Sequence, residues 1–369
     1  MKRIYLDNAA TTPLLPEVKD FMCRALELYG NPSSSHRIGE EARELLELAR
    51  ENIASFLNVL PSEIVFNSCA TEGNNTVLRN VLYLKRRGNI VISSIEHKSV
   101  KAVARELEKE GIELREAIVG TDGIVELEAL QTLIDEDTLL VSVMSVSNEF
   151  GTIQPIHEIS KLCMERGVPF HTDAVQALGK VNFSLQGVNY ATFSAHKFHA
   201  PKGVGFMFVR EGSVLKPLLL GGGQEGGLRS GTQNLPGILA MAKALELIYE
   251  NLDENISKVE KLRDSFESLL LEKIPDVKIV GKYSRRSPSI SAVIFPRGNS
   301  RDIVNGLSER DLFCSSGSAC SSGEVIPNEH LIKMGFSQEE ATRMVRFSFG
   351  LLNGEEEVSE AVDRILKVL

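Results

Sequence analysis

The sequence ATFSAHKFHAPKG, residues 191–203, sets a short apolar run, a lysine and a proline–glycine turn in direct succession. Working outward, residues 17–209 alternate short apolar runs with amphipathic stretches, which is the pattern of βαβ units around a mostly parallel sheet. We expect strands at residues 64–67, 90–93, 114–119, 139–146, 169–172, 191–194 and 205–209, and helices at residues 71–86, 99–110, 127–134 and 156–166. An open α/β sheet of this kind binds ligands along the edge where its strands end.

A smaller unit is expected to follow this sheet. The run Gly221-Gly222-Gly223 interrupts the alternation, and a helical pattern over residues 235–270 is interpreted as a bridge between two lobes. Shorter strands are expected at residues 277–280 and 290–295, and helices at residues 301–307, 337–343 and 356–368. A chain of 369 residues exceeds the size at which one hydrophobic core stops growing. We therefore expect a large domain at residues 16–255 and a small α/β domain made of residues 1–15 and 256–369.

Composition and charge narrow the classes of function. A hydrophobic fraction of 43% and a charged fraction of 25% are typical of a globular protein. The formal charge of -9 argues against a protein that binds the nucleic-acid backbone, which normally presents a basic face. Residues 1–6 contain no apolar signal core, and the apolar run at residues 139–146 is too short to cross a bilayer, so we expect a cytoplasmic protein.

The cysteines indicate neither a disulfide framework nor a structural zinc site. They are Cys23, Cys69, Cys163, Cys314 and Cys320, with no C-x-x-C pair and no histidine at zinc-finger spacing. In a reducing compartment these thiols stay free, so most are expected to be small buried hydrophobes. No metal site is expected.

Lys197 is the first candidate for chemistry because it follows a strand directly. A lone lysine is usually a solvated surface charge. At a sheet edge between Ser194, His196 and the turn at residues 201–203, however, its amine can be desolvated, which favours the neutral form that makes a Schiff base. Such chemistry needs an electron sink, and pyridoxal phosphate supplies one.

Three further sites fit that cofactor. Asp173 follows the strand at residues 169–172 and could pair with the ring nitrogen, with Gln176 placed to reach the ring hydroxyl. Taken alone, however, an aspartate at this position is more often only a helix N-cap. The loop NSCATEGNN, residues 67–75, opens a helix and offers an anion site, but such residues are also ordinary caps. His97 could stack on the ring and carry protons, although a lone histidine is more often structural.

Taken together, these motifs resemble the class V, fold-type I pyridoxal-phosphate enzymes, and within them the group I cysteine desulfurases of the NifS/IscS type. The matching stretches are residues 5–12 (YLDNAATT), 31–36 (NPSSSH), 69–72 (CATE), 95–98 (IEHK), 148–155 (NEFGTIQP), 173–176 (DAVQ), 194–197 (SAHK), 221–225 (GGGQE), 228–232 (LRSGT), 315–320 (SSGSAC) and 346–348 (RFS). They follow the family's order along nearly the whole chain. Gly226-Gly227 departs from the usual Arg-Gly pair, which leaves the local interface contacts open.

The resemblance implies a role for each matching residue. Lys197 binds the cofactor covalently, Asp173 pairs with the ring nitrogen, Gln176 meets the ring hydroxyl and His97 stacks on the ring. The phosphate is held by Ala70, Thr71, Ser194 and His196, with Thr232 reaching in from the partner subunit of a homodimer. Asn148 lies near the ring hydroxyl and the substrate carboxylate. Arg346 clamps that carboxylate with its planar fork, although an arbitrary arginine is more often part of a surface ion pair.

Cys320 is the expected nucleophile. It lies in the small-residue stretch CSSGSACSSG, residues 314–323, which is too flexible to form a packed element and suits a thiol that must carry sulfur away. Cys314 is expected to lie on the preceding strand and to pack.

The resemblance thus implies a cysteine desulfurase that converts L-cysteine to L-alanine and leaves a persulfide on Cys320, for iron-sulfur cluster assembly or thiolation acceptors. A selenocysteine lyase or another class V enzyme is an alternative, as is a non-catalytic sulfur-carrier or partner-binding subunit. A class V transaminase needs no loop cysteine, and the intact Lys197, Asp173 and His97 argue against a non-catalytic subunit. The sulfur acceptor is left open.

Overall fold

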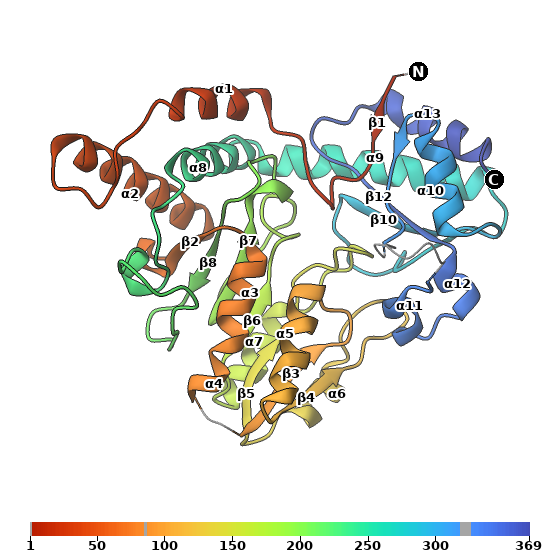
Figure 1. The fold of residues 1–369 in the computed structure, drawn as a ribbon. Helices are drawn as coiled ribbons and strands as arrows, with labels where there is room; N and C mark the ends of the chain where they lie inside the picture. The colour runs from red at the N-terminus through yellow and green to blue at the C-terminus, as the bar shows by residue number, and fades with distance from the viewer. Residues whose placement is uncertain (1, 85–86, 318–325) are drawn as a thin grey trace.

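The fold is built around a seven-stranded sheet with the strand order β2-β8-β7-β6-β5-β3-β4. The computed structural model describes residues 2–84, 87–317 and 326–369 (Figure 1). The strands are β2 (Ile64–Asn67), β3 (Gly88–Ser93), β4 (Ile112–Ala117), β5 (Thr138–Ser142), β6 (Phe170–Asp173), β7 (Tyr190–Ser194) and β8 (Gly205–Val209). Only β8 runs antiparallel to its neighbours. The mostly parallel sheet expected from the sequence is confirmed.

The sheet has a hydrophobic core on each face. One core lies against α2 (Arg37–Leu57), α7 (Ile156–Glu165) and α8 (Leu235–Tyr249), and the other against α3 (Ala70–Arg79) and α5 (Lys98–Lys109). Because both faces are covered, β2, β5, β7 and β8 are buried along their whole length, which explains why they read as continuous apolar runs rather than alternating ones.

The remaining helices of the large unit differ in part from the expected ones. They are α1 (Pro16–Ala25), α4 (Val81–Leu84), α6 (Leu127–Leu133) and the 3₁₀ turns η1 (Pro61–Glu63), η2 (Ala195–Lys197) and η3 (Glu225–Gly227). The helix expected at residues 71–86 is divided, since α3 ends at Arg79 and α4 follows as a separate turn. The strand expected at residues 139–146 ends at Ser142, although Val143 and Ser145 still donate backbone hydrogen bonds to the chain at β6.

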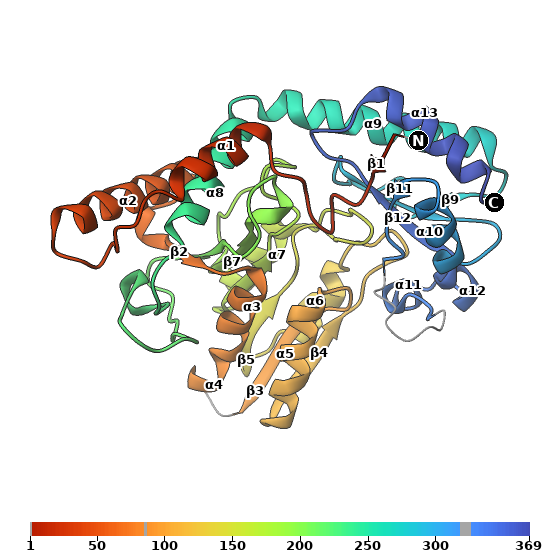
Figure 2. The same cartoon turned by 45° about the horizontal axis from the view of Figure 1, so that its top comes forward.

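A second, smaller sheet has the order β12-β10-β9 and is antiparallel throughout. Its strands are β9 (Lys278–Ile279), β10 (Ile290–Ile294) and β12 (Met344–Ser348). The helices of this part of the chain are α10 (Ser300–Ser308), α11 (Glu329–Lys333), α12 (Gln338–Thr342) and α13 (Glu355–Leu366). Beside it, β1 (Ile4–Tyr5) pairs in parallel with β11 (Leu312–Phe313). Both ends of the chain therefore lie beside the small sheet (Figures 1 and 2).

Two helices lead from the large sheet to the small one. The helical stretch expected at residues 235–270 is α8 followed by α9 (Leu252–Lys273), with a break at residues 250–251 (Figure 1). The break has a local cause, because Asn251 leaves the helical conformation at φ -137° and the Asn255 side chain donates to the Ile248 carbonyl. A third core, distinct from those of the large sheet, includes Phe266 of α9 together with residues of β10, β12 and α13.

Two features are absent from the described ranges, residues 2–84, 87–317 and 326–369. No helix there is long and apolar enough to cross a bilayer. No group of three or more His, Cys, Asp or Glu side chains there is arranged to hold a metal ion.

We expect Phe206→Ala to destabilise the large sheet by about 3 kcal/mol or more. Phe206 on β8 is fully buried and stacks on Phe193 of β7 with ring centroids 4.4 Å apart, so its removal leaves a cavity in the core. Urea denaturation measures the change. The control, Tyr283→Ala at a side chain 95% exposed, should change the free energy of unfolding by less than about 0.5 kcal/mol. Equal effects of the two substitutions would contradict this assignment of the core.

Candidate active site

A cavity of about 810 Å³ lies at the ends of the parallel strands, where the large sheet faces the small unit. Its lining contains most of the residues singled out in the sequence. These are Ala70, Thr71, His97, Asn148, Asp173, Gln176, Ser194, His196, Lys197 and Arg346. The structure thus brings together side chains from β6, β7, α3, β12 and the loops between them.

Lys197 ends the 3₁₀ turn that follows β7, and the turn aims its amine back at the N-terminal segment of the chain. Nζ donates to the Ala9 carbonyl at 2.9 Å and to the Ala10 carbonyl at 2.7 Å. Burial, with the positive charge of Arg346 acting in the same direction, lowers the pKa of Lys197 to about 8, while Asp173 and Asp7 oppose the shift. The amine is therefore much closer to its neutral, nucleophilic form than an exposed lysine is.

Asp173 is the last residue of β6, and both of its carboxylate oxygens are fixed. Oδ1 accepts from the Val175 backbone amide at 3.1 Å, and Oδ2 accepts from Asn74 Nδ2 at 2.9 Å. The bond to Val175 is the turn contact of a cap, but no helix follows, so the alternative interpretation of Asp173 as a helix N-cap is wrong. A buried carboxylate held in one orientation at the cavity wall suits a protonated ring nitrogen.

Gln176 forms the floor beside Asp173. Its Nε2 donates to the Ala9 carbonyl at 2.9 Å, and its Oε1 accepts from Lys180 Nζ at 2.7 Å. Burial lowers the pKa of Lys180 to about 7, with the charges of Lys197 and Arg346 acting in the same direction. The orientation of the Gln176 amide is set by these two partners, which directs its donor toward the Lys197 side of the cavity.

His97 begins α5, and its Nδ1 accepts a hydrogen bond from the Ser99 backbone amide. The ring lines the cavity and keeps an exposed face there, while the protein around it shields it from part of the solvent. This desolvation lowers the pKa of His97, which outweighs the opposite effect of the Asp173 charge. The ring is therefore favoured in its neutral form, as stacking on an aromatic cofactor requires.

The end of the cavity at α3 suits a phosphate. The Ala70 amide at the start of this ten-residue helix donates to Ser194 Oγ at 2.8 Å, and Thr71 follows it, so backbone donors face the cavity together with the positive end of the helix dipole. His196 Nδ1 lies 3.2 Å from Thr11 Oγ1, and burial lowers the pKa of His196 to about 4. With the carboxylate of Asp173 and the amine of Lys197, these groups match the chemistry of pyridoxal phosphate.

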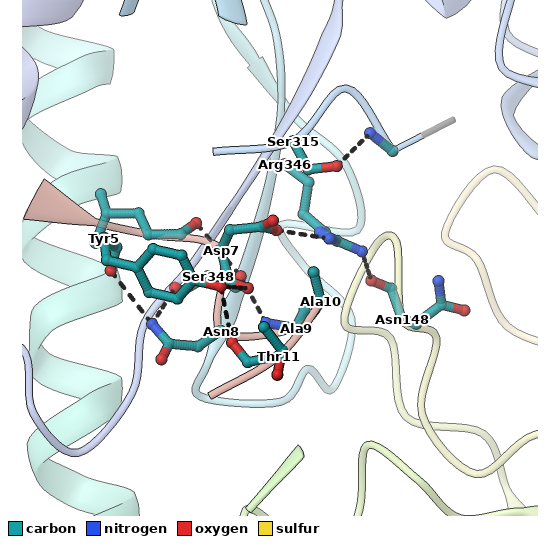
Figure 3. Close-up of polar contacts among 12 residues, drawn as sticks. Tyr5, Asp7, Asn8, Ala9, Ala10, Thr11, Asn148, Ser315, Arg346 and Ser348 are labelled. Atoms are coloured by element: carbon teal, nitrogen blue, oxygen red, sulfur yellow. Dashed lines mark hydrogen bonds and ion pairs between the residues drawn. The ribbon is translucent and has the colours of Figure 1, made fainter. Parts of the chain in front are cut away.

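Arg346, on β12, lines the cavity from the side of the small sheet. Figure 3 shows its polar contacts. Its Nη2 binds Asp7 Oδ1 at 2.8 Å, and its Nη1 donates to the Asn148 carbonyl at 2.8 Å. Within the described part of the chain its Nε is buried and has no hydrogen-bond partner. The guanidinium is nearly buried, and Nη1 and Nη2 each carry a second hydrogen beyond the one given to Asn148 or Asp7, so Arg346 is suited to anchor an incoming carboxylate rather than to form a surface ion pair.

Among the described residues, Thr232 is the one expected site residue that is not on this cavity. Thr232 lies on an exposed segment and is absent from the lining. Cys320 lies outside the described residues, but Ser315 and Gly317, earlier in the same stretch, line the cavity. Cys314 lies one residue beyond β11 rather than on it, packs against the core of the small unit, and has its pKa raised by burial.

Several lining residues carry no role in the sequence-based interpretation. Ala9 and Ala10 act through their carbonyls, which no side-chain motif reveals, although the stretch at residues 5–12 is among those that match the family. Arg301 and Asn305 of α10 also line the cavity. They belong to no motif, so only the fold could place them.

We expect Arg346→Gln to raise the pKa of Lys197. The substitution removes a positive neighbour and leaves the Asp7 carboxylate without its ion pair, and both changes favour the charged amine. In cofactor-free protein, reductive methylation at a series of pH values, followed by peptide mass spectrometry, reports the pKa of Lys197. Lys161, on an exposed turn of α7, serves as the internal reference. An unchanged midpoint for Lys197 would contradict the electrostatic account.

Comparisons with known proteins agree with this geometry. The family described as "Aminotransferase class-V" matches residues 4–361. A protein of Nostoc sp. named "Cysteine desulfurase" is 39% identical over 100% of this chain and 92% of its own length. "Cysteine desulfurase IscS" of Dictyoglomus turgidum is also 39% identical, over 100% of this chain and 95% of its own.

Solved structures give the same result. One described as "NIFS-LIKE PROTEIN" has a TM-score of 0.93 at 40% identity and covers 100% of this chain and 99% of its own. Another, "SspA in complex with cysteine", has a TM-score of 0.84 at 32% identity over 96% of this chain and 100% of its own. The chain belongs to the class V aminotransferase family, whose members depend on pyridoxal phosphate.

Proposed function

We propose that this protein is a cysteine desulfurase, which takes sulfur from L-cysteine, leaves L-alanine and stores the sulfur as a persulfide on Cys320. One observation carries the proposal. Lys197 with its depressed pKa, the fixed carboxylate of Asp173 and the guanidinium of Arg346 face a single cavity. The names of the Nostoc and Dictyoglomus relatives, which match along the whole chain, support the same activity.

Pyridoxal phosphate, when bound, supplies an electron sink that weakens bonds at the α- and β-carbons of an amino acid. The residues that would hold it are those of the cavity floor. Asp173 would meet the ring nitrogen, Gln176 and Asn148 the ring hydroxyl, and His97 the ring face, while Lys197 would bind it covalently. Ala70, Thr71, Ser194 and His196 would receive the phosphate, with Thr232 of a second subunit completing the set.

The substrate is oriented by its carboxylate. Arg346 offers a planar fork already aligned by Asp7 and Asn148, so little side-chain entropy is lost when a carboxylate binds. That contact places the α-carbon toward Lys197. Because the Lys197 amine has a pKa of about 8, a large share of it is neutral near pH 8 and can accept the α-proton at Nζ.

Cys320 is the proposed sulfur acceptor. Its thiolate attacks the sulfur of the substrate, so that an S–S bond forms as the C–S bond breaks and the electron pair of that bond returns to carbon. The carbon then takes up a proton and the product is alanine. L-Cysteine and one enzyme thiol give alanine and one enzyme persulfide, so no external oxidant is needed.

The wider assignments belong to this proposal as well. We propose a cytoplasmic homodimer that passes sulfur to an acceptor protein, with iron-sulfur scaffolds as the first acceptors to test. The division into residues 16–255 and residues 1–15 with 256–369 stays a prediction. Selenocysteine is the second candidate substrate, because selenium could leave by the same route; parallel assays with the two amino acids distinguish them.

Cys320→Ser should keep bound pyridoxal phosphate and its visible absorbance while forming no persulfide, because the substitution removes only the sulfur acceptor. The measurement is alanine release and persulfide labelling after incubation with L-cysteine. Cys23→Ser, at an exposed cysteine on α1, is the matched control and should retain full activity. Undiminished persulfide formation in Cys320→Ser would refute the role of Cys320 without bearing on the cofactor site.

Light scattering should give a particle of twice the 40.6 kDa chain mass. If Thr232 completes the partner's phosphate site, Thr232→Val should also release pyridoxal phosphate several-fold faster on dialysis, because one donor to the phosphate is lost. Thr132→Val, at an exposed threonine on α6, should not. A particle of one chain mass would contradict the homodimer. A Thr232→Val variant that holds its cofactor as firmly as the wild type would contradict the role of Thr232.

A further inference from the structure

A buried hydrogen-bond chain runs behind the cavity and joins Asp173 to His97 through a residue with no assigned role. Asn74, on α3, is fully buried. Its Nδ2 donates to Asp173 Oδ2 at 2.9 Å and to Ser99 Oγ at 2.8 Å. Ser99 Oγ in turn lies 2.7 Å from His97 Nδ1. The chain connects the side chain expected at the ring nitrogen with the one expected on the ring face.

The orientation of the Asn74 amide follows from its partners. Thr192 Oγ1 donates to Asn74 Oδ1 at 2.6 Å, which leaves both Nδ2 hydrogens for Asp173 and Ser99. A flipped amide would set its oxygen against the Asp173 carboxylate, which has no hydrogen to give when ionised. The hydrogen bonds of Asn74 therefore have one orientation, in which its amide group donates to both Asp173 and Ser99.

The hydrogen on Ser99 is fixed in the same way. Its Oγ accepts from Asn74, and its single hydroxyl hydrogen donates to His97 Nδ1, because that nitrogen already accepts from the Ser99 backbone amide and carries no hydrogen of its own. The Ser99 backbone amide donates to the same nitrogen at 3.1 Å. Two donors converge on Nδ1, and a nitrogen that accepts two hydrogen bonds carries no proton.

We propose that Asn74 is a positioning residue that sets the direction of this chain, so that His97 keeps its proton on Nε2 and presents a donor to the cavity. Nε2 lies on the side of the ring away from Ser99, and it has no hydrogen-bond partner in the described part of the chain. His97 thus serves as a hydrogen donor, not as a base, toward whatever occupies the cavity. The use of this donor in desulfuration rests on the proposed function, whereas the protonation pattern does not.

The charges around His97 bear on the same point. Asp173 and Glu149 favour a charged ring, while Lys197 of η2 and Lys98 of α5 disfavour it. Desolvation is the largest effect and also disfavours the charged ring. A protonated Nδ1 would set its hydrogen against the Ser99 backbone N–H, and it could keep the contact to Ser99 Oγ only if the hydroxyl turned away. Geometry and environment therefore act together.

The test is ¹⁵N NMR of histidine-labelled protein, with and without pyridoxal phosphate, and with His97→Gln to assign the signals. In the wild type, Nδ1 of His97 should resonate as an unprotonated nitrogen and Nε2 as a protonated one from about pH 6 to pH 9, the range in which an unperturbed histidine loses its charge. A proton on Nδ1 in the wild type would overturn the proposal.

Asn74→Asp tests the role of the amide. The new carboxylate is isosteric but accepts hydrogen bonds, so the Ser99 hydroxyl turns toward it and away from His97. We expect the pKa of His97 to rise and both nitrogens to be protonated at the acid end of the titration. The matched control is Asn75→Asp on the same helix, where the amide donates to the Thr71 carbonyl. It adds the same charge but lies outside the hydrogen-bond chain from Asp173 to His97. Equal titrations in the two folded variants would refute the assignment.

Ser99→Ala covers the case in which Asn74→Asp does not fold. Loss of one donor to Nδ1 should increase the minor His97 tautomer about fivefold, the factor that corresponds to one ordinary hydrogen bond. An unchanged tautomer ratio contradicts the proposal. Alanine release from L-cysteine by the wild type is measured separately, so failure of the desulfurase assignment and failure of the tautomer assignment are distinguished.

Discussion

The site depends on a short segment near the N-terminus that bonds to both sheets. On one side, the Ala9 amide donates to Ser348 Oγ at 2.8 Å, and Asn8 Nδ2 donates to the Ser348 carbonyl at 2.8 Å, which fixes the segment to β12 (Figure 3). On the other side, Thr12 donates to the His196 carbonyl through both its amide and its hydroxyl, while Ala9 and Ala10 accept from Lys197. Without these contacts, neither the lysine amine nor Arg346 would have a fixed place.

Electrostatics at the cavity follow from the same arrangement. Arg346 and Lys197 are brought close enough to lower the pKa of the lysine, and the cost of that repulsion is limited because Asp7 pairs with the arginine. Asp173 supplies a second negative charge near the amine. The cavity can therefore hold a neutral amine beside an anchored guanidinium. Without the nearby carboxylates, two positive charges at this distance would repel each other more strongly.

Much of the large sheet could be predicted because its strands are buried on both faces and bounded by turns, as for β8 between Gly203 and Gly212. The residues that follow those strands, Asp173 and Lys197 among them, could be placed at the site because parallel strands end along one edge. The break between α8 and α9 could not, since it rests on the backbone of Asn251 rather than on periodicity. Nor could the roles of Ala9, Ala10 and Asn74, which act through carbonyls or through a buried amide that resembles any helix-surface asparagine in sequence.

The contacts between residues 8 and 348 have a consequence for how the protein is made. Asn8 and Ser348 are 340 positions apart, so this pairing has one of the largest sequence separations the chain allows. Contacts of such range form late, because the intervening chain must first be synthesised and ordered. On the ribosome, the large sheet can form its core while the segment that carries the Ala9 and Ala10 carbonyls still lacks its contacts to Ser348. Competence to anchor a substrate carboxylate should therefore arise abruptly, when the strand carrying Arg346 emerges, rather than in step with the growing fold.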